Sequence, residues 1–425
     1  MRGHPLRSAV VLLPALLAAC GEPDLEVKGT LDRVVGEVVT LRLAAGEDGF
    51  SGTLELVDAR ARKFSGAALK VQKTDDKELS FVVPGGVAPG KATARVGRKD
   101  SDEDYNVPLD INRLALGLDD NGTIETLPLA PATLAPGSIS RIEAAGGLVS
   151  LSPSGGQLAV LAKDELSLLA LGATAKPVGP AIQQKDGRAI FAVPDGVLVC
   201  TDTALLLVRF KDGNTSQLTA TIAGCQGVAG DDDGTVAAVL HTCDSDSDTT
   251  MEDCVTVFQI GSALTEVTNQ KNISLDAKPD ATHIAMTADG KGVVVADPEL
   301  IHGLWLGDGS KAPEPVAVKW GQAATIVGLD RGPFSLGDLF VAADAATKTV
   351  LLLGFDPNAG HLFKKLKEEI TLPDTPTAMA YGLGTQLYVA SGTKLYLLDA
   401  EQPQKEAEEL QLAGASKLLS LAVQP

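Results

Sequence analysis

The sequence predicts an all-β chain that ends in a large repeat domain, and two observations support this. Short apolar segments alternate with polar residues at the period of two that is typical of half-buried strands, and clusters of Gly, Pro and Asp separate them. From about Leu114 onward, a unit made of a turn, an apolar strand, a second turn and another apolar strand recurs. A recurring unit of this kind indicates an architecture built from copies of one small sheet.

The first 20 residues have the three parts of an export signal. Arg2 and Arg7 supply positive charge, the apolar stretch Ala9–Leu17 follows, and the segment closes with Leu17-Ala18-Ala19-Cys20. The apolar stretch is shorter than the roughly 20 residues that a membrane-spanning helix needs. The closing tetrapeptide resembles the lipobox of bacterial lipoproteins, in which the cysteine thiol takes a diacylglycerol and cleavage leaves it as the new N-terminus. The alternative is an ordinary secretory signal that happens to contain a cysteine.

The lipobox resemblance implies a location in the cell envelope. Residues 1–19 would be the signal peptide, Cys20 the lipidation site, and residues 20–25 a lipidated tether. Gly21 after the cysteine favours the outer membrane under the enterobacterial sorting rule. Other lineages sort differently, so the choice of membrane and its face, periplasmic or cell-surface, stays open. The chain carries 36 basic and 55 acidic residues, a formal charge of −19, which argues against nucleic acid as a ligand. The expected partners are the membrane, through the anchor, and an envelope protein or polysaccharide.

Residues 26–111 read as a separate β-domain. Thr53–Val57 and Ala92–Val96 alternate as strands do, and between them Leu79–Gly90 ends a strand in Val83-Pro84-Gly85-Gly86, with Pro89-Gly90 before the next one. This last segment resembles the signature of IPT/TIG immunoglobulin-like domains, although the usual opening Pro-x-x-Gly-Pro is missing. The resemblance implies an Ig-fold β-sandwich that binds or spaces other domains and is not itself catalytic.

Residues 112–425 are predicted to form a β-propeller. Clear copies of the repeat lie at Leu151–Leu161, Gly230–Leu240, Met286–Ala296 and Tyr381–Ser391. Their spacing is that of four-stranded blades of about 40–50 residues. The pattern resembles YVTN and WD-type propellers, without the Gly-His and Trp-Asp signature of the WD family proper.

The predicted propeller would be closed by both of its ends. Lys417–Val423 reads as an inner strand, and Asn112–Leu127, with its Asp119-Asp120-Asn121-Gly122 turn, would supply the outer strands beside it. Such a closure removes two exposed sheet edges. It predicts seven blades, with six or eight as alternatives.

Four cysteines follow Cys20, an even number that favours disulfides in an oxidising compartment. Cys243 and Cys254 flank an acidic loop and are expected to pair across adjacent strands, which leaves Cys200 and Cys225 to pair between neighbouring blades. Four cysteines allow three connectivities, and the sequence alone does not choose among them. Their spacings do not fit the Cys-x-x-Cys knuckles of a zinc site.

The acidic loop begins with Asp244, Asp246 and Asp248, a carboxylate spacing that suits Ca²⁺. Thr249 stands where a calcium loop needs glycine, and Val255 stands where it needs glutamate. The loop is therefore a weak candidate metal site and is more simply a solvated acidic loop. No other cofactor is indicated.

No catalytic residues are predicted. The histidines that follow Cys20 lie in no His-Glu-x-x-His or nucleophile-elbow motif, and a structural role is expected for each. Trp320, on the turn Lys319-Trp320-Gly321, is a candidate partner contact. With an aromatic content of 4%, the chain has few side chains that could stack against sugars or bases.

The sequence therefore favours a membrane-anchored extracytoplasmic lipoprotein that acts as a non-catalytic binding or scaffold module. One alternative is a propeller-type hydrolase or lactonase with a metal or carboxylate site at the central channel. The residues of such a site come from several blades, so a single sequence does not reveal whether they are present. A second alternative is an accessory factor in outer-membrane assembly. The ligand and the oligomeric state are not indicated.

Overall fold

The computed structural model of the chain describes most positions between residues 31 and 423. The described residues are 31–34, 38–42, 50–57, 63–69, 72–75, 78–83, 90–98, 104–119, 124–129, 140–142, 147–152, 156–171, 175–194, 196–211, 214–244, 250–275, 280–320, 325–331, 339–366, 369–382, 386–400, 402, 405–411 and 417–423. The predicted signal peptide, Cys20 and the tether lie outside these residues. Among the described residues, no helix is long and apolar enough to cross a membrane.

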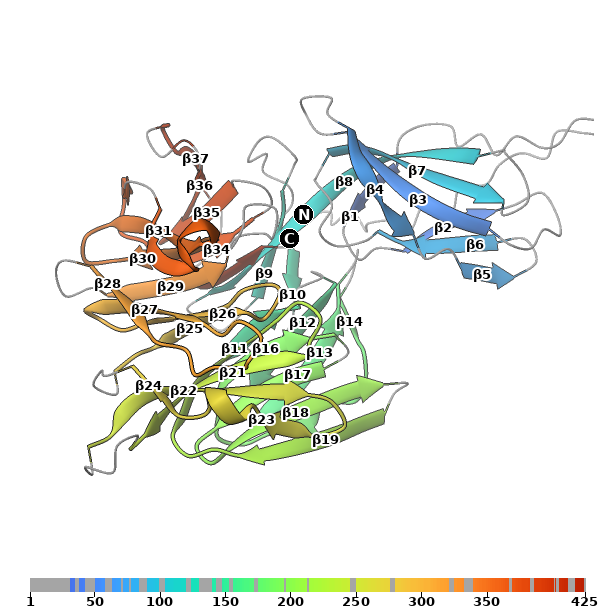
Figure 1. Cartoon of the computed structure of the whole chain (residues 1–425). Coiled ribbons are helices and arrows are strands. Elements are labelled where there is room, and N and C mark those ends of the chain that lie inside the picture. The colour runs from blue at the N-terminus through green and yellow to red at the C-terminus, as the bar shows by residue number, and fades with distance from the viewer. Residues whose placement is uncertain are drawn as a thin grey trace, which may run out of the picture.

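The N-terminal part contains two sheets, drawn at the upper right of Figure 1. Its strands are β1 (Leu31–Val34), β2 (Val38–Arg42), β3 (Phe50–Val57), β4 (Lys63–Leu69), β5 (Gln72–Asp75), β6 (Glu78–Val82), β7 (Gly90–Arg98) and β8 (Asp104–Asp119). One sheet has the order β2-β6-β5, and in the other β8, β7, β3 and β4 are neighbours, with β1 parallel to β8. Alternate residues of both sheets are buried, including Phe81 of one sheet and Val107 of the other.

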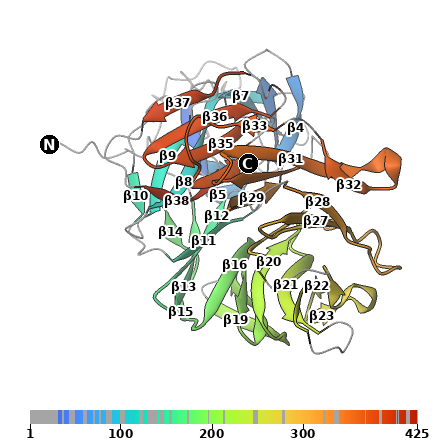
Figure 2. The same cartoon turned by 90° about the vertical axis from the view of Figure 1, so that its left-hand side faces the viewer.

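The described residues between 148 and 411 form a β-propeller with six blades, each a separate sheet of consecutive strands (Figures 1 and 2). Blade 1 contains β11 (Leu148–Leu151), β12 (Gln157–Ala162), β13 (Glu165–Ala170), β14 (Lys176–Pro177) and β15 (Ile182–Gln183). Blade 2 contains β16 (Gly187–Val193), β17 (Gly196–Thr201), β18 (Ala204–Lys211) and β19 (Asn214–Thr221). Blade 3 contains β20 (Cys225–Gly230), β21 (Val236–Cys243), β22 (Glu252–Ile260), β23 (Leu264–Glu266) and β24 (Ile273–Ser274), with the 3-10 helix η1 (Thr268–Gln270).

Blades 4 to 6 repeat the same order of strands. Blade 4 contains β25 (His283–Met286), β26 (Gly292–Ala296), β27 (Leu300–Trp305) and β28 (Val316–Lys319). Blade 5 contains β29 (Ile326–Arg331), β30 (Leu339–Asp344), β31 (Thr349–Asp356), β32 (Leu362–Lys365) and β33 (Ile370–Thr371), with the 3-10 helix η3 (Pro357–Ala359). Blade 6 contains β34 (Ala378–Tyr381), β35 (Gln386–Ser391), β36 (Lys394–Asp399) and β37 (Glu408–Gln411).

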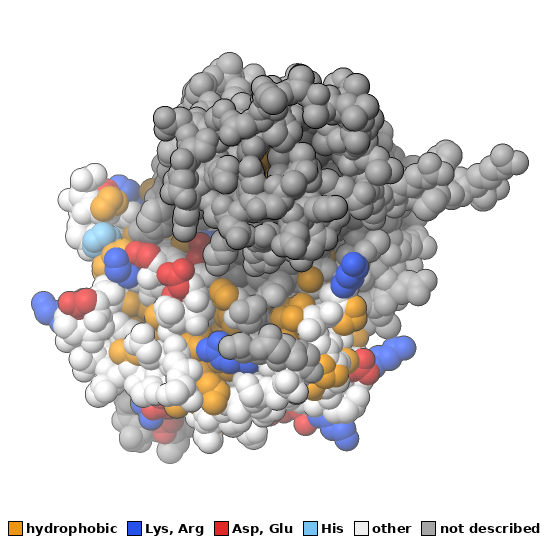
Figure 3. Space-filling model, turned by 90° about the vertical axis from the view of Figure 1, so that its right-hand side faces the viewer, with side chains coloured by type: hydrophobic (Ala, Val, Ile, Leu, Met, Phe, Trp, Pro, Cys, Tyr) orange, Lys and Arg blue, Asp and Glu red, His pale blue; other side chains and the backbone are white. Residues whose placement is uncertain are grey.

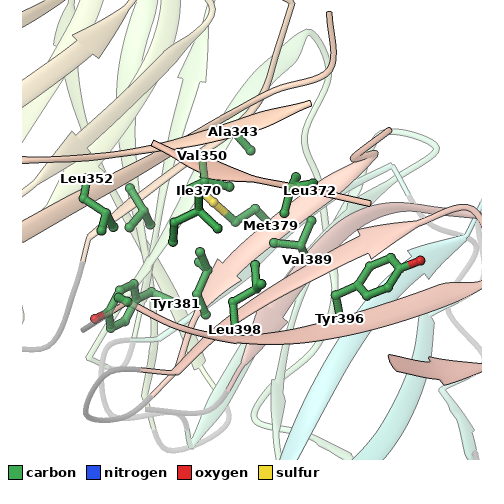
Figure 4. Close-up of a cluster of buried hydrophobic side chains, with 13 residues drawn as sticks. Ala343, Val350, Leu352, Ile370, Leu372, Met379, Tyr381, Val389, Tyr396 and Leu398 are labelled. Atoms are coloured by element: carbon green, nitrogen blue, oxygen red, sulfur yellow. The ribbon is translucent and has the colours of Figure 1, made fainter. Parts of the chain in front are cut away.

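The composition of each strand follows from its place in the blade. The second strands are continuous apolar runs, such as Gly292–Ala296, and every residue of that run is buried because neighbouring blades cover both faces. Fourth strands are polar, as in Asn214–Thr221, where most residues are exposed. Figure 4 shows the packing between blades 5 and 6, in which Val350 and Ile370 of one blade meet Met379 and Val389 of the other. The inner strands β11, β16, β20, β25, β29 and β34 contact one another in chain order around the propeller axis.

Two segments distant in the sequence meet beside the first and last blades. The C-terminal strand β38 (Leu418–Val423) pairs antiparallel with the second half of β8, which in turn pairs with β9 (Ile124–Leu129), and β9 pairs with β10 (Ser140–Ile142). Strand β38 also contacts the inner strands β34 and β11. The predicted meeting of Lys417–Val423 with Asn112–Leu127 is thus present in the structure.

The count of seven separate blades is nevertheless not supported. Strands β38, β9 and β10 belong to one eight-stranded sheet with β1, β3, β4 and β7, because the 16-residue strand β8 runs through both halves of it. β8 passes without a break through the predicted domain boundary between residues 111 and 112. The physical reason is that the first part of this single extended segment pairs with the N-terminal strands β7 and β1, and its second part pairs with β9 and β38.

Both disulfides join the cysteines that were predicted to pair. Cys200 of β17 is bonded to Cys225 of β20, so this bond links blade 2 to blade 3. Cys243 of β21 is bonded to Cys254 of β22, inside blade 3. Cys200, Cys225 and Cys254 are fully buried.

Candidate functional site

The inner strands finish at one end of the propeller axis, and we call the residues there the axial end. Three of the turns at this end are organised by the same polar position of the repeat. The hydroxyl of Ser152 accepts from Gln157 N at 3.0 Å, and the carboxylate of Asp231 accepts from Thr235 N at 2.8 Å. In blade 4 the hydroxyl of Thr287 accepts a similar bond. A side-chain acceptor at this position fixes the turn between the first two strands.

Arg331, the last residue of β29 in blade 5, crosses the axial end toward two other blades. One nitrogen of its guanidinium donates to the carbonyl of Met286 in blade 4 at 3.3 Å. Another donates to the carboxylate of Asp232, just after β20 in blade 3. The Arg331 side chain is 19% exposed and that of Asp232 is 45% exposed. Three consecutive inner strands are therefore tied together by one basic side chain.

Asp330 precedes Arg331 and is held by backbone donors. Its carboxylate accepts from Tyr381 N of blade 6 at 2.8 Å and from Arg331 N at 2.8 Å. Burial raises the pKa of the Asp330 carboxyl, although the two N–H donors and the charge of Arg331 oppose the shift. Partial burial also raises the pKa of Asp232, against the opposing effect of Arg331. The axial end therefore combines one cation with two carboxyl groups that favour their neutral form more than usual.

A second group of ionisable residues lies between blades 3 and 4. The Asp253 side chain of β22 is fully buried and accepts from Asp280 N at 3.1 Å and Ala281 N at 2.8 Å, through Oδ2 alone. Its Oδ1 is buried and has no hydrogen-bond partner among the described residues. Asp297 and His302 form a buried pair in blade 4, with 2.9 Å between Oδ2 and Nε2. Burial raises the pKa of Asp253 to about 6, helped by the charges of Asp280 and Asp297.

The raised pKa of Asp253 predicts a pH-dependent stability. The folded protein binds this proton more tightly than the unfolded chain, whose aspartate pKa is near 3.9. Stability from this group is therefore fully present below about pH 4 and is lost as the pH rises through about 6. We expect the wild type to lose about 1–3 kcal/mol across this range through Asp253 and the Asp253→Asn variant to lack that loss. Urea midpoints between pH 4 and 8 measure this difference, and parallel curves for the two proteins would contradict it.

The acidic loop is only partly within the described residues. Asp244 is exposed, while Asp246 and Asp248 lie outside the described residues, so calcium binding there stays a prediction. Elsewhere in the described part of the chain, no three His, Cys, Asp or Glu side chains are grouped closely enough to hold a metal ion. The disulfide between Cys243 and Cys254 closes the base of this loop, as expected.

The described histidines have structural neighbours. Nε2 of His241 lies 2.9 Å from the Thr256 hydroxyl, and burial lowers the pKa of this imidazole. The His361 ring stacks on Trp305 with 3.7 Å between ring centroids. Trp320 is half-buried and packs against the apolar cluster shared by blades 4 and 5, so it is less exposed than its turn position suggested. Its role as a partner contact stays a prediction.

The face drawn in Figure 3 shows no further cluster of charged side chains among the described residues. Acidic and basic side chains are dispersed there among neutral and apolar ones over the described part of the propeller.

Three residues of these sites were not identified from the sequence: Asp330, Arg331 and Asp253. Arg331 and Asp232 are separated by 99 positions, and only the ring of blades brings them together.

No protein-family model and no curated protein matches the chain. Several solved structures do. One is a functionally unknown protein from Desulfotomaculum acetoxidans, with 15% identity, a TM-score of 0.54, and coverage of 73% of this chain and 98% of that one. The periplasmic gluconolactonase PpgL of Pseudomonas aeruginosa has 12% identity, a TM-score of 0.53, and coverage of 74% and 99%. Apo AztD from Citrobacter koseri has 10% identity, a TM-score of 0.50, and coverage of 73% and 97%. Together with the six sheets, these likenesses define the chain as a β-propeller protein.

Proposed function

We propose that the protein is an envelope lipoprotein, anchored through Cys20, whose propeller is a non-catalytic module that binds an envelope protein or polysaccharide. The N-terminal sheets act as an Ig-like spacer of the IPT/TIG kind between the anchor and the propeller. Strands β38, β8, β9 and β10 serve as a seventh blade that closes the ring and joins it to the spacer. Support for the closure comes from the contacts of β38 with both β34 and β11.

The observation that carries the non-catalytic proposal is how the buried carboxylates are used. Asp231 fixes a turn, and Asp330 accepts from two backbone N–H groups of blades 5 and 6. Asp297 accepts from Glu299 N, Leu300 N and His302. These groups hold the backbone of individual blades or of adjacent pairs, and they do not converge on a common point where a substrate could react. A rigid ring with loops at both ends is suited to presenting a binding surface.

A hydrolase or lactonase is the second candidate function. It is favoured by the carboxyl groups of Asp232 and Asp330, which both accept hydrogen bonds from Arg331 and whose pKa values are raised by burial. A carboxyl group with a raised pKa is suited to general acid-base chemistry. The gluconolactonase noted above shares the fold, which by itself assigns no activity to this chain.

In-cell crosslinking followed by affinity capture tests the proposal. Two forms are compared, the wild type and Cys20→Ala, which keeps the propeller and loses the anchor. We expect a specific envelope protein or polysaccharide to be captured by the wild type and lost with Cys20→Ala. Capture of the same partner by both forms would show that binding does not require the lipid anchor. Turnover of a lactone by the purified protein, abolished in Asp330→Asn, would replace it with the second candidate.

A further inference from the structure

The guanidinium of Arg331 contacts one backbone carbonyl and one carboxylate among the described residues. The backbone at Arg331 is held by Asp330, which accepts from Arg331 N and from Tyr381 N of the next blade. The carbonyl of Met286 fixes one end of the guanidinium at 3.3 Å. Its other N–H donors meet a single acceptor among the described residues, the carboxylate of Asp232. An arginine can donate five N–H groups in a planar fork, and the described residues accept from two nitrogens of this one.

Asp232 is a replaceable partner. Its side chain is 45% exposed, and an ion pair with an exposed carboxylate contributes little to stability. The turn that carries Asp232 does not need this side chain, because Asp231 caps it through Thr235 N and because Asp232 N donates to the carbonyl of Ala288 at 3.0 Å. The carboxylate can therefore move away from Arg331 while the turn keeps its shape.

We propose that the axial end of the propeller binds a small anion, a carboxylate or a phosphate group, through Arg331, and that Asp232 occupies the place of this anion when it is absent. The site is separate from the macromolecular partner proposed above. The carboxylate of Asp330 is engaged by the backbone N–H groups of Arg331 and Tyr381, so Asp232 is the only described carboxylate bonded to the guanidinium. The protein as a whole carries a charge of −19, which disfavours polyanions at long range. The ligand is therefore a small anion in direct contact with the arginine.

Calorimetric titration of the full mature chain with acetate and with inorganic phosphate, at constant ionic strength, tests the site. Cys20→Ala keeps the protein in solution for this experiment. We expect Asp232→Asn to bind the anion about two- to fivefold more tightly, because a competing exposed carboxylate is removed. Arg331→Gln should bind at least about tenfold more weakly, with Arg331→Lys between it and the wild type. Lys291→Gln changes an exposed lysine on the neighbouring turn, paired to Asp289 at 3.2 Å, and is expected to bind as the wild type does.

The two probes separate the two sources of the ligand, since a carboxylate site takes acetate and a phosphate site takes phosphate more tightly. The inference is overturned if neither probe binds to the wild type or to Asp232→Asn. It is equally overturned if Arg331→Gln and Arg331→Lys bind as the wild type does while their thermal unfolding is unchanged. Loss of binding in Lys291→Gln as well would show that general surface charge, and not Arg331, attracts the anion.

Discussion

The variant in which Cys200 and Cys225 are both replaced by alanine is expected to have a free energy of unfolding about 3–4 kcal/mol lower than that of the wild type. This disulfide closes a loop with a sequence separation of 25 and links blade 2 to blade 3. Its removal frees the unfolded chain to adopt more conformations, and it also leaves two shortened side chains in a fully buried contact. Urea denaturation of the oxidised mature protein measures the loss.

The second disulfide provides a matched control. Cys243 and Cys254 are separated by only 11 positions and lie inside one blade, so replacing both by alanine should cost less, about 2–3 kcal/mol. The expected order is therefore a larger loss for the bond between blades than for the bond within one. An equal or reversed order would contradict the view that the first disulfide holds neighbouring blades together.

The Leu418→Ala variant is expected to lose about 2–5 kcal/mol of stability, because it empties a buried site in the strand that joins the two ends of the propeller. Leu418 of β38 is 3% exposed and lies so close to β8 that a Cβ added at Gly117 would be 2.6 Å from its Cδ2 atom. Its cluster includes Ala378 and Leu395 of blade 6. The loss measures how much the C-terminal strand contributes to ring closure, and thermal or urea unfolding records it.

The adjacent residue is the control for this prediction. Leu419 is 49% exposed, so Leu419→Ala removes the same atoms from the same strand with an expected change within about 0.5 kcal/mol. If both variants lose the same amount, the strand is not packed between blade 6 and β8 as the structure shows. If only Leu418→Ala is destabilised, closure by β38 is an energetic feature of the fold.

Features set by local pattern could be predicted from the sequence. The apolar runs of the second strands, such as Gly292–Ala296, and the polar position that caps the turns at Ser152, Asp231 and Thr287 recur along the chain and need no knowledge of the ring. The disulfide between Cys243 and Cys254 could be predicted for the same reason, since its two strands are neighbours in the sequence. The meeting of the C-terminal strand with β8 followed from the unpaired segments left at the two ends.

Features set by contact between blades could not be predicted. Asp232 and Arg331 come together only because blades 3 and 5 flank blade 4, and nothing near either residue in the sequence marks the pair. In the sequence, nothing distinguishes Asp253 from other acidic residues. In the structure, the next blade covers it, and Ala281 N donates a hydrogen bond to its carboxylate. Six separate blades was one of the alternatives to the favoured seven, and the sequence could not choose between them because the length of β8, which decides whether its two halves form one sheet, depends on both domains. Trp320 was expected on an open turn, and the neighbouring blade half-buries it.

Mass spectrometry of the N-terminal peptide of the mature protein, combined with fractionation of the cells that produce it, tests whether the protein is anchored through Cys20. We expect a diacylglycerol-modified Cys20 at the N-terminus and recovery of the protein with membranes, with Cys20→Ala recovered in the soluble fraction. An unmodified N-terminus at another residue, with the wild type equally soluble, would contradict the anchored location on which the proposed binding role depends.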